Sequence, residues 1–257
     1  MIKVLIFGCG GSMGRVLADL VGGTDDIEVA AGVDAFVEGQ EFTFPVFARL
    51  DDCDVAVDVI VDFSSPKALR DLLDGARQIN VPLVIATTGH SAEDREYMLQ
   101  VSESIPIFQA ANMSIGINLL TDLLQKTAAV LGNQFDIEII EKHHNLKKES
   151  LPVMDQHDTK DIGSETAQNE TIDVEYQIQF AEADEVLSLK HTSYSNEASA
   201  AGVIRAIRFI SGKTPGCYSM KEMIAEDSTW SNMQTSSERD IVPISDGIYD
   251  PLKGGKI

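Results

Sequence analysis

The sequence predicts an α/β protein: a doubly wound parallel sheet, with an inserted α+β unit that has an open mixed or antiparallel sheet. Three observations predict it. Short apolar runs alternate with segments of helical periodicity through residues 1–113. The first apolar run is followed at once by a glycine-rich turn. From about residue 172 the period changes to strict alternation, which is typical of an antiparallel strand with one buried face.

The chain begins with a predicted strand, glycine turn and helix, in that order. Residues 1–7 are largely apolar, residues 8–14 read Gly-Cys-Gly-Gly-Ser-Met-Gly, and apolar residues then recur at helical spacing to Val21. Glycines permit a tight turn, close approach of the backbone to a pyrophosphate, and a helix N-terminus aimed at that anion. A glycine motif alone is weak evidence, and an unrelated turn is the alternative.

A second apolar run, residues 27–33, ends in Asp34. Asp34 follows Gly14 at about the 20-residue spacing of a ribose-binding carboxylate, so the two together predict a Rossmann-type dinucleotide site. A carboxylate accepts hydrogen bonds from ribose hydroxyls and repels a 2′-phosphate. Residues 35–40 contain no Lys or Arg to hold such a phosphate. We therefore expect NADH as the cofactor, with NADPH as the weaker alternative.

The alternation continues along the first half of the chain. Residues 55–62, 81–86 and 105–109 are predicted strands, and residues 66–76 and 92–102 are predicted helices. Each of these strands is followed by small or polar residues. Ligands of doubly wound sheets bind at the carboxyl ends of the strands, so these residues are candidates for the same site as the glycine turn. The alternative is that they are ordinary loop residues.

The pattern changes after Ser114. Residues 115–131 predict a long helix and residues 135–142 a strand, and apolar residues alternate from Ile172 to Phe180, with a partner strand over residues 186–191. Residues 198–210 are helical again and are expected to rejoin the first unit. The predicted domains are a dinucleotide-binding unit (1–113), a substrate and oligomerisation unit (114–202), a return to the first unit (203–230) and a tail without a recognisable period (231–257).

A short basic segment, Glu141-Lys-His-His-Asn-Leu-Lys147, follows the predicted strand core 135–140. The whole chain carries a formal charge of −21, so a cationic loop in it is local. An anionic small substrate that must be held and protonated would account for it. A solvated basic turn is the alternative.

Composition narrows the class of protein. A chain of 257 residues with 44% hydrophobic residues suits one large domain or two modest ones. No apolar run approaches membrane-spanning length, and the acidic balance argues against nucleic acid or anionic membranes as partners. The three cysteines are far apart and lack metal-ligand spacing. We expect reduced thiols, a cytoplasmic location and no metal site.

Six motifs in order resemble the 4-hydroxy-tetrahydrodipicolinate reductase (dihydrodipicolinate reductase) family of bacterial lysine synthesis by the diaminopimelate route. Together they are specific, although no one of them is, and the match covers residues 1–147 and 172–226. The motifs are Gly8 to Gly14, Asp62 to Pro66, Ala86 to Gly89, Gln109 to Ser114, Glu141 to Lys147 and Lys190 to Ser195.

The resemblance implies an NAD(P)H-dependent oxidoreductase that reduces a cyclic, unsaturated dicarboxylate by hydride transfer and protonation of the neighbouring carbon. It implies that His143 and Lys147 serve the protonation step and that His144 contacts the substrate. Residues 161–167 resemble the family's carboxylate-binding turn, which adds Ser164 and Thr166 as candidate substrate residues. Lys148, next to Lys147, is a further candidate for holding the carboxylates. It also implies a homotetramer assembled through the second sheet; the alternative is that a helix of the same chain covers that sheet. The implied cofactor residues are Gly8, Cys9, Gly10, Gly11, Ser12, Met13, Asp34, Phe63, Ala86, Thr87, Thr88, Ala110, Ala111, Asn112 and Met113.

The sequence departs from the family pattern at three places. The family follows the motif lysine with a glycine- and threonine-containing turn that grips a substrate carboxylate, whereas Lys147 leads here into Lys-Glu-Ser-Leu-Pro152. Asn196 and Ser12 stand where the family commonly has arginine. A second hypothesis is therefore an NAD-binding, reductase-like paralogue with a lost or changed substrate and a regulatory or scaffold role.

Overall fold

The computed structural model describes residues 1–37, 39–131, 134–143, 163–164 and 174–227. Its larger sheet is parallel and has the strand order β11-β6-β5-β4-β1-β2-β3. The chain runs outward in one direction from β1 to β3 and then crosses to β4 on the other side of β1, so the order reverses between β1 and β4. The strands are β1 (Ile2–Phe7), β2 (Ile27–Val33), β3 (Val46–Phe47), β4 (Val59–Asp62), β5 (Leu83–Ile85), β6 (Pro106–Gln109) and β11 (Gly216–Tyr218).

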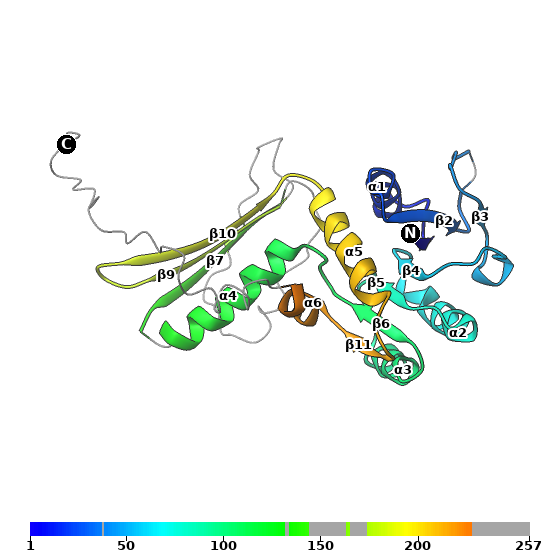
Figure 1. The fold of residues 1–257 in the computed structure, drawn as a ribbon. Coiled ribbons are helices and arrows are strands. Elements are labelled where there is room, and N and C mark those ends of the chain that lie inside the picture. Colours follow the sequence, from blue (N-terminus) through cyan, green and yellow to red (C-terminus); the bar gives the residue numbers. More distant parts are fainter. Residues whose placement is uncertain (38, 132–133, 144–162, 165–173, 228–257) are drawn as a thin grey trace, which may run out of the picture.

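Helices cover both faces of this sheet, as in a doubly wound fold (Figure 1). Val4 and Ile6 of β1 belong to the core beneath α1 (Ser12–Val21), α5 (Glu197–Ile210) and α6 (Met220–Asp227). Leu5, between them, belongs to the opposite core beneath α2 (Leu69–Ile79) and α3 (Ala92–Ser102). The central strand is therefore apolar on both faces, which is why it reads as a continuous run rather than as an alternation. Two single turns of 3-10 helix, η1 (Leu50–Asp52) and η2 (Pro66–Ala68), complete this unit.

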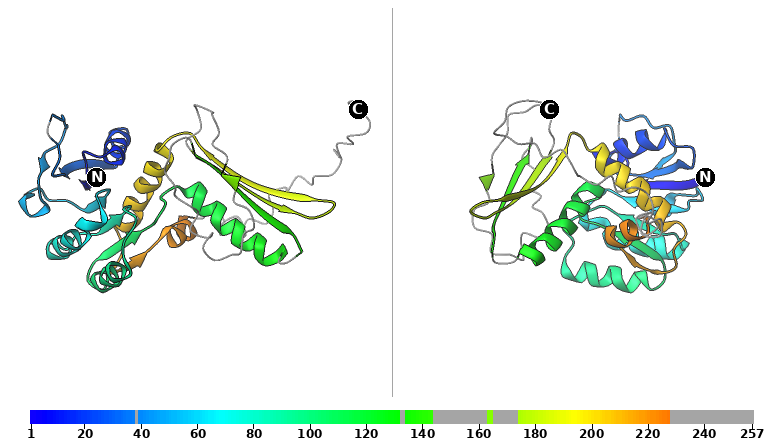
Figure 2. Two further views of the ribbon diagram at one scale, coloured as in Figure 1. Left: turned by 180° about the vertical axis from the view of Figure 1, so that it is seen from behind. Right: turned by 60° about the vertical axis from the view of Figure 1, so that its left-hand side comes forward.

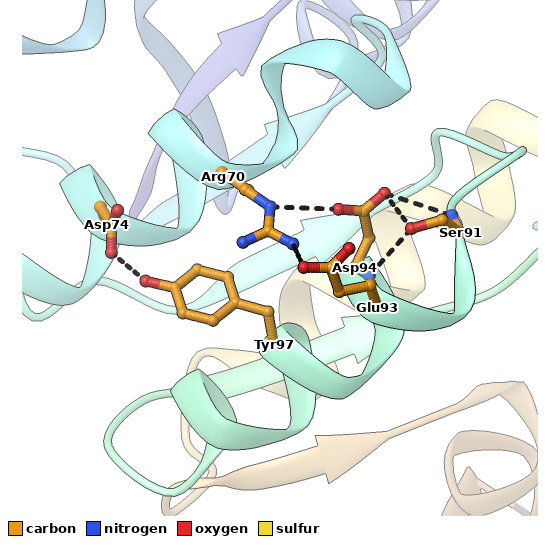
Figure 3. Close-up of polar contacts among 6 residues, drawn as sticks. All are labelled: Arg70, Asp74, Ser91, Glu93, Asp94 and Tyr97. Carbon is orange, nitrogen blue, oxygen red and sulfur yellow. Dashed lines mark hydrogen bonds and ion pairs between the residues drawn. The ribbon is translucent and has the colours of Figure 1, made fainter.

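Polar contacts join α2 to α3 at the surface (Figure 3). Ser91 and Asp94 form a reciprocal capping box at the start of α3. Arg70 of α2 pairs with Asp94 at 3.3 Å, and its guanidinium carbon lies 5.2 Å from the centre of the Tyr97 ring. The Tyr97 hydroxyl donates a hydrogen bond to Asp74 of α2. These contacts bridge the two helices on the solvent side of the apolar core.

The smaller sheet has the order β10-β9-β7-β8 and lies apart from the first sheet (Figure 2). Its strands are β7 (Asp136–His143), β8 (Gly163–Ser164), β9 (Val174–Ala181) and β10 (Val186–Ser193); β7, β9 and β10 are antiparallel, and β8 is parallel to β7. The alternating residues Tyr176, Ile178 and Phe180 pack against α4 (Ile115–Leu131) in a separate core. A helix of the same chain therefore covers the apolar face, which is the alternative to subunit contact at that face.

The structure confirms the predicted fold class, and helices 92–102 and 115–131 have the predicted bounds. Most other limits differ from the prediction by one or two residues. Larger differences occur at two places: the strand expected from residue 55 begins at Val59, and the helix expected over residues 66–76 starts as the 3-10 turn η2 and continues as α2 to Ile79. The strand expected to end at residue 142 continues through His143. None of the helices in the described part of the chain combines the length and apolar character that a membrane crossing needs.

Candidate active site

The carboxyl ends of five neighbouring strands form one continuous edge of the larger sheet. Residues at four of these ends each donate a backbone amide to the end of an adjacent strand, so the segments that follow the strands are held side by side. The four hydrogen bonds are Gly8 to Val33 (2.7 Å), Phe63 to Phe7 (2.9 Å), Ala86 to Asp62 (3.1 Å) and Ala110 to Ile85 (3.4 Å). The predicted cofactor residues therefore lie along a single edge, although they come from distant parts of the sequence.

The glycine turn lies at the point where the strand order reverses, between β1 and β4. Gly8 has φ +89°, and a Cβ there would lie 2.8 Å from the carbonyl carbon of Phe63. A Cβ on Gly14 would lie 2.5 Å from the carbonyl oxygen of Gly8. The turn therefore needs glycine at both positions. It leads into the N-terminus of α1 at Ser12, so free amides and the positive end of the helix dipole meet at this crevice, which fits a pyrophosphate.

Asp34 follows β2 and faces the glycine turn. Its Oδ2 accepts a hydrogen bond from the amide of Gly10, and its Oδ1 accepts one from the amide of Phe36, both at 2.9 Å. A Cβ on Gly10 would lie 2.9 Å from Oδ2, so a larger residue there would displace the carboxylate. The carboxylate is thus held in a fixed orientation beside the turn, which fits the ribose-binding role predicted for it.

Cys9 fills the space behind the turn. Its side chain is buried, and burial, with the nearby Asp34 charge, raises the pKa of the thiol to about 11. Such a thiol stays protonated near neutral pH and is a poor nucleophile. Cys9 is therefore a small packing residue beside the cofactor crevice.

A buried polar cluster of Asp62, Thr87 and His90 lies at and after the carboxyl ends of β4 and β5, and of these three only Thr87 was predicted as a site residue. Asp62 is fully buried and its Oδ1 accepts hydrogen bonds from the amide and hydroxyl of Ser64 at 2.9 and 2.6 Å. Burial raises the pKa of Asp62. Among the described residues, Oδ2 of Asp62, the Thr87 hydroxyl and both ring nitrogens of His90 are buried without a hydrogen-bond partner. His90 follows Gly89 in the loop after β5, and nothing in that local sequence indicates that its side chain is buried.

The predicted catalytic segment is only partly described. His143 is the last residue of β7, where its backbone pairs with Val174 of β9. The backbone of Ser164, in β8, pairs with Glu141 two residues earlier in β7, so these two candidates lie on neighbouring strands. The basic segment therefore begins inside β7, whose last three residues are Glu141, Lys142 and His143. The remaining predicted residues, His144, Lys147, Lys148 and Thr166, lie outside the described residues.

His191 of β10 lies where the smaller sheet meets the start of α4. A Cβ on Gly116 would lie 2.4 Å from its Nε2, so the imidazole packs directly on the helix backbone. Burial lowers the pKa of His191, which favours a neutral ring. His191 is therefore a packed residue rather than a proton donor. In the described residues no group of His, Cys, Asp or Glu is arranged to hold a metal ion.

A doubly wound parallel sheet with this glycine turn and this carboxylate places the chain in the class of dinucleotide-binding α/β proteins, which includes nicotinamide-dependent oxidoreductases. Two family models match the chain: dihydrodipicolinate reductase, N-terminus, over residues 2–113, and dihydrodipicolinate reductase, C-terminus, over residues 116–224. The chain belongs to the dihydrodipicolinate reductase family.

Similar proteins support this assignment over most of the chain. The 4-hydroxy-tetrahydrodipicolinate reductases of Clostridium novyi and Caldanaerobacter subterraneus are 35% and 36% identical, each over 87% of this chain and 98% of the relative. The dipicolinate-bound dihydrodipicolinate reductase of Paenisporosarcina sp. TG-14 shares the fold, with a TM-score of 0.67 at 23% identity over 85% of this chain and 97% of the other. DAP dehydrogenase of C. glutamicum also shares it, with a TM-score of 0.57 at 11% identity, over 91% and 98% of the two chains.

Proposed function

We propose that this enzyme reduces 4-hydroxy-tetrahydrodipicolinate, or the dihydrodipicolinate derived from it, to tetrahydrodipicolinate in the diaminopimelate route to lysine. The observation that carries the proposal is family membership across both halves of the chain, together with a nucleotide crevice whose glycines and carboxylate are in place. A relative with this fold binds dipicolinate, a planar cyclic dicarboxylate of the proposed substrate class.

NADH, when bound, supplies the hydride. The roles proposed for the chain's own residues are proton transfer and charge neutralisation. His143 would act as general acid toward the carbon next to the one reduced, with Lys147 favouring the anionic reactant beside it. His144, Lys148, Ser164 and Thr166 would hold the two carboxylates. The β7–β8 pairing supports a common location for His143 and Ser164, because it places their backbones on adjacent strands.

NADH is proposed as the preferred cofactor. Support comes from Asp34, whose two oxygens are fixed by backbone amides beside the glycine turn, so its charge cannot easily turn away from an incoming 2′-phosphate. Desolvating two like charges together is unfavourable. We expect a higher kcat/KM with NADH than with NADPH; a strong preference for NADPH would contradict the proposal.

The paralogue hypothesis is favoured by one observation, the altered sequence after Lys147, where the family's carboxylate-gripping turn is replaced. A coupled assay with the upstream aldolase-type synthase separates the two hypotheses, because that enzyme generates the unstable substrate in place. Loss of NADH absorbance that depends on both enzymes supports the reductase. Measurable NADH binding without turnover selects the paralogue.

A homotetramer in the cytoplasm completes the proposal. With α4 covering one face of the smaller sheet, the opposite face is the one on which subunits would meet. It is polar along its centre, where Gln179 has Glu138 and Ser188 as its register partners. Light scattering at micromolar concentration tests the assembly, and a monomeric mass would contradict it.

A further inference from the structure

A five-residue connector, residues 110–114, joins β6 to α4 and so links the two units. Asn118, in the first turns of α4, holds this connector with its side-chain amide. Its Nδ2 lies 2.8 Å from the carbonyl oxygen of Asn112 and 2.8 Å from that of Ser114. One side chain therefore binds two carbonyls of the connector.

Further contacts fix the same short segment. The amide of Ser114 donates to Oδ1 of Asn112 at 2.9 Å, and the Ser114 hydroxyl accepts from the amide of Ile117 at 3.4 Å. On the other side, Gly202 of α5 lies so close that a Cβ there would be 1.7 Å from the carbonyl oxygen of Met113. The carbonyls of three successive residues are thus each set by a contact.

These contacts exceed what the helix start requires. The Ser114 hydroxyl already caps α4 through Ile117, so Asn118 is not needed as a cap. The described residues contain no cis peptide bond, and in a trans peptide the C=O and N–H groups point in opposite directions. By drawing the Asn112 carbonyl toward α4, Asn118 turns the amide of Met113 away from the helix. What Asn118 controls is the direction of peptide groups in the connector.

The place of the connector in the sheet identifies the ligand group it faces. Asp34, at the end of β2, lies on the side of the glycine turn that takes the adenosine ribose. The connector follows β6, which lies on the other side of the turn beyond β4 and β5. A dinucleotide laid across the strand ends therefore brings its nicotinamide half to the connector.

We propose that Asn118 is a positioning residue: it holds the connector so that its peptide groups orient the nicotinamide for hydride transfer. The inference rests on the proposed function for the reaction, but the cofactor contact itself is independent of which substrate is reduced. Because α4 also leads into the smaller sheet, Asn118 ties the cofactor side of the site directly to the unit that carries His143.

The test compares Asn118→Ala and the isosteric Asn118→Asp with Thr121→Val. Thr121 is also half-buried on α4, and its hydroxyl bonds to the Ile117 carbonyl within the helix, so its loss reports on helix stability alone. We expect both Asn118 variants to weaken NADH binding, measured by fluorescence titration without substrate, by about tenfold, the equivalent of one or two lost hydrogen bonds. We expect a larger deuterium isotope effect on kcat with 4-deuterated NADH, and Thr121→Val to stay within about twofold of wild type.

Three results would overturn the inference: NADH affinity and isotope effect unchanged in the Asn118 variants, equal losses in Thr121→Val, or failure of both Asn118 variants to fold. If Asn118→Ala alone does not fold, Asn118→Asp decides, since it keeps the shape and removes the donor. Failure of the proposed function is distinguishable. A wild-type protein that binds NADH but does not reduce the dicarboxylate refutes the substrate, while the affinity comparison still judges Asn118.

Discussion

The two halves of the proposed site are built in different ways. Along the edge of the larger sheet, the groups that would meet the cofactor are mostly backbone amides and carbonyls, placed by glycines and by strand order. In the smaller sheet, the proposed chemistry depends on side chains at and beyond the end of β7, and the sheet itself serves to carry them. Binding a nucleotide thus constrains the path of the chain, whereas proton transfer constrains a few side chains.

Replacing the proposed acid should have the largest effect on turnover. His143→Gln keeps a polar side chain at the end of β7 but cannot deliver a proton. We expect kcat to fall by about 10²- to 10⁴-fold, the usual contribution of a general acid, while the NADH dissociation constant stays within about twofold of wild type. Steady-state kinetics and NADH titration together check this. Full turnover in the variant would remove His143 from the role, and an equal loss of NADH binding would place it in the cofactor half instead.

A substitution in the glycine turn of the larger sheet should have the opposite pattern and weaken NADH binding. In Gly14→Ala, the added methyl would lie 2.5 Å from the Gly8 carbonyl oxygen, and both partners are backbone, so the turn must shift. We expect a loss of about 1–3 kcal/mol in the free energy of unfolding and weaker NADH binding. Gly212→Ala is the matched control, because nothing lies within 4 Å of its added Cβ. Equal NADH affinity in Gly14→Ala and Gly212→Ala would show that the turn does not form the cofactor crevice.

The same difference explains what could be read from the sequence. The glycine turn and Asp34 were predicted because a backbone-built site needs particular residues at fixed spacing. The long helices were predicted because their apolar stripes repeat many times. By contrast, β3 and β11 were not predicted, because strands of two and three residues are too short to show a period. The short helix α6 was not predicted either. Asn118 and Gly202 were also missed, because each acts on a residue from another element that only the fold brings near.

Two carboxylates of the larger unit, the buried Asp62 and the exposed Asp26, should contribute to the free energy of unfolding with opposite dependence on pH. The pKa of Asp62 is raised by burial, so the folded state holds its proton more tightly than the unfolded state does. Its contribution to the free energy of unfolding therefore falls as pH rises above about 4, the unfolded value. Asp62→Asn does not titrate, so its stability relative to wild type should rise with pH over that interval, as measured by urea unfolding.

Asp26 is the opposite case. Its hydrogen bonds with Arg208, at 2.7 and 2.8 Å, lower its pKa, so its contribution is present at neutral pH and is lost as the pH falls through the lowered value. Asp26→Asn should therefore be less stable than wild type at neutral pH, and this difference in the free energy of unfolding should shrink as the pH falls. Parallel pH profiles for the two variants would mean that Asp62 is hydrated in solution, and that the cluster with Thr87 and His90 is not buried from water.

The smallest effect on stability is expected at the α2–α3 surface, which has no part in the proposed cofactor or substrate site. Tyr97→Phe removes the hydrogen bond to Asp74 but keeps the ring beneath the Arg70 guanidinium (Figure 3). Exposed polar contacts exchange with water, so we expect a change below about 1 kcal/mol in the free energy of unfolding and no change in NADH affinity. Tyr97→Leu also removes the ring and should cost about 0.5–1 kcal/mol more. A double-mutant cycle with Arg70→Met isolates that share. A coupling energy near zero would mean that the buried leucines of α2, rather than the Arg70–Tyr97 contact, hold α2 against α3. A change in NADH affinity would show that this surface is coupled to the cofactor site.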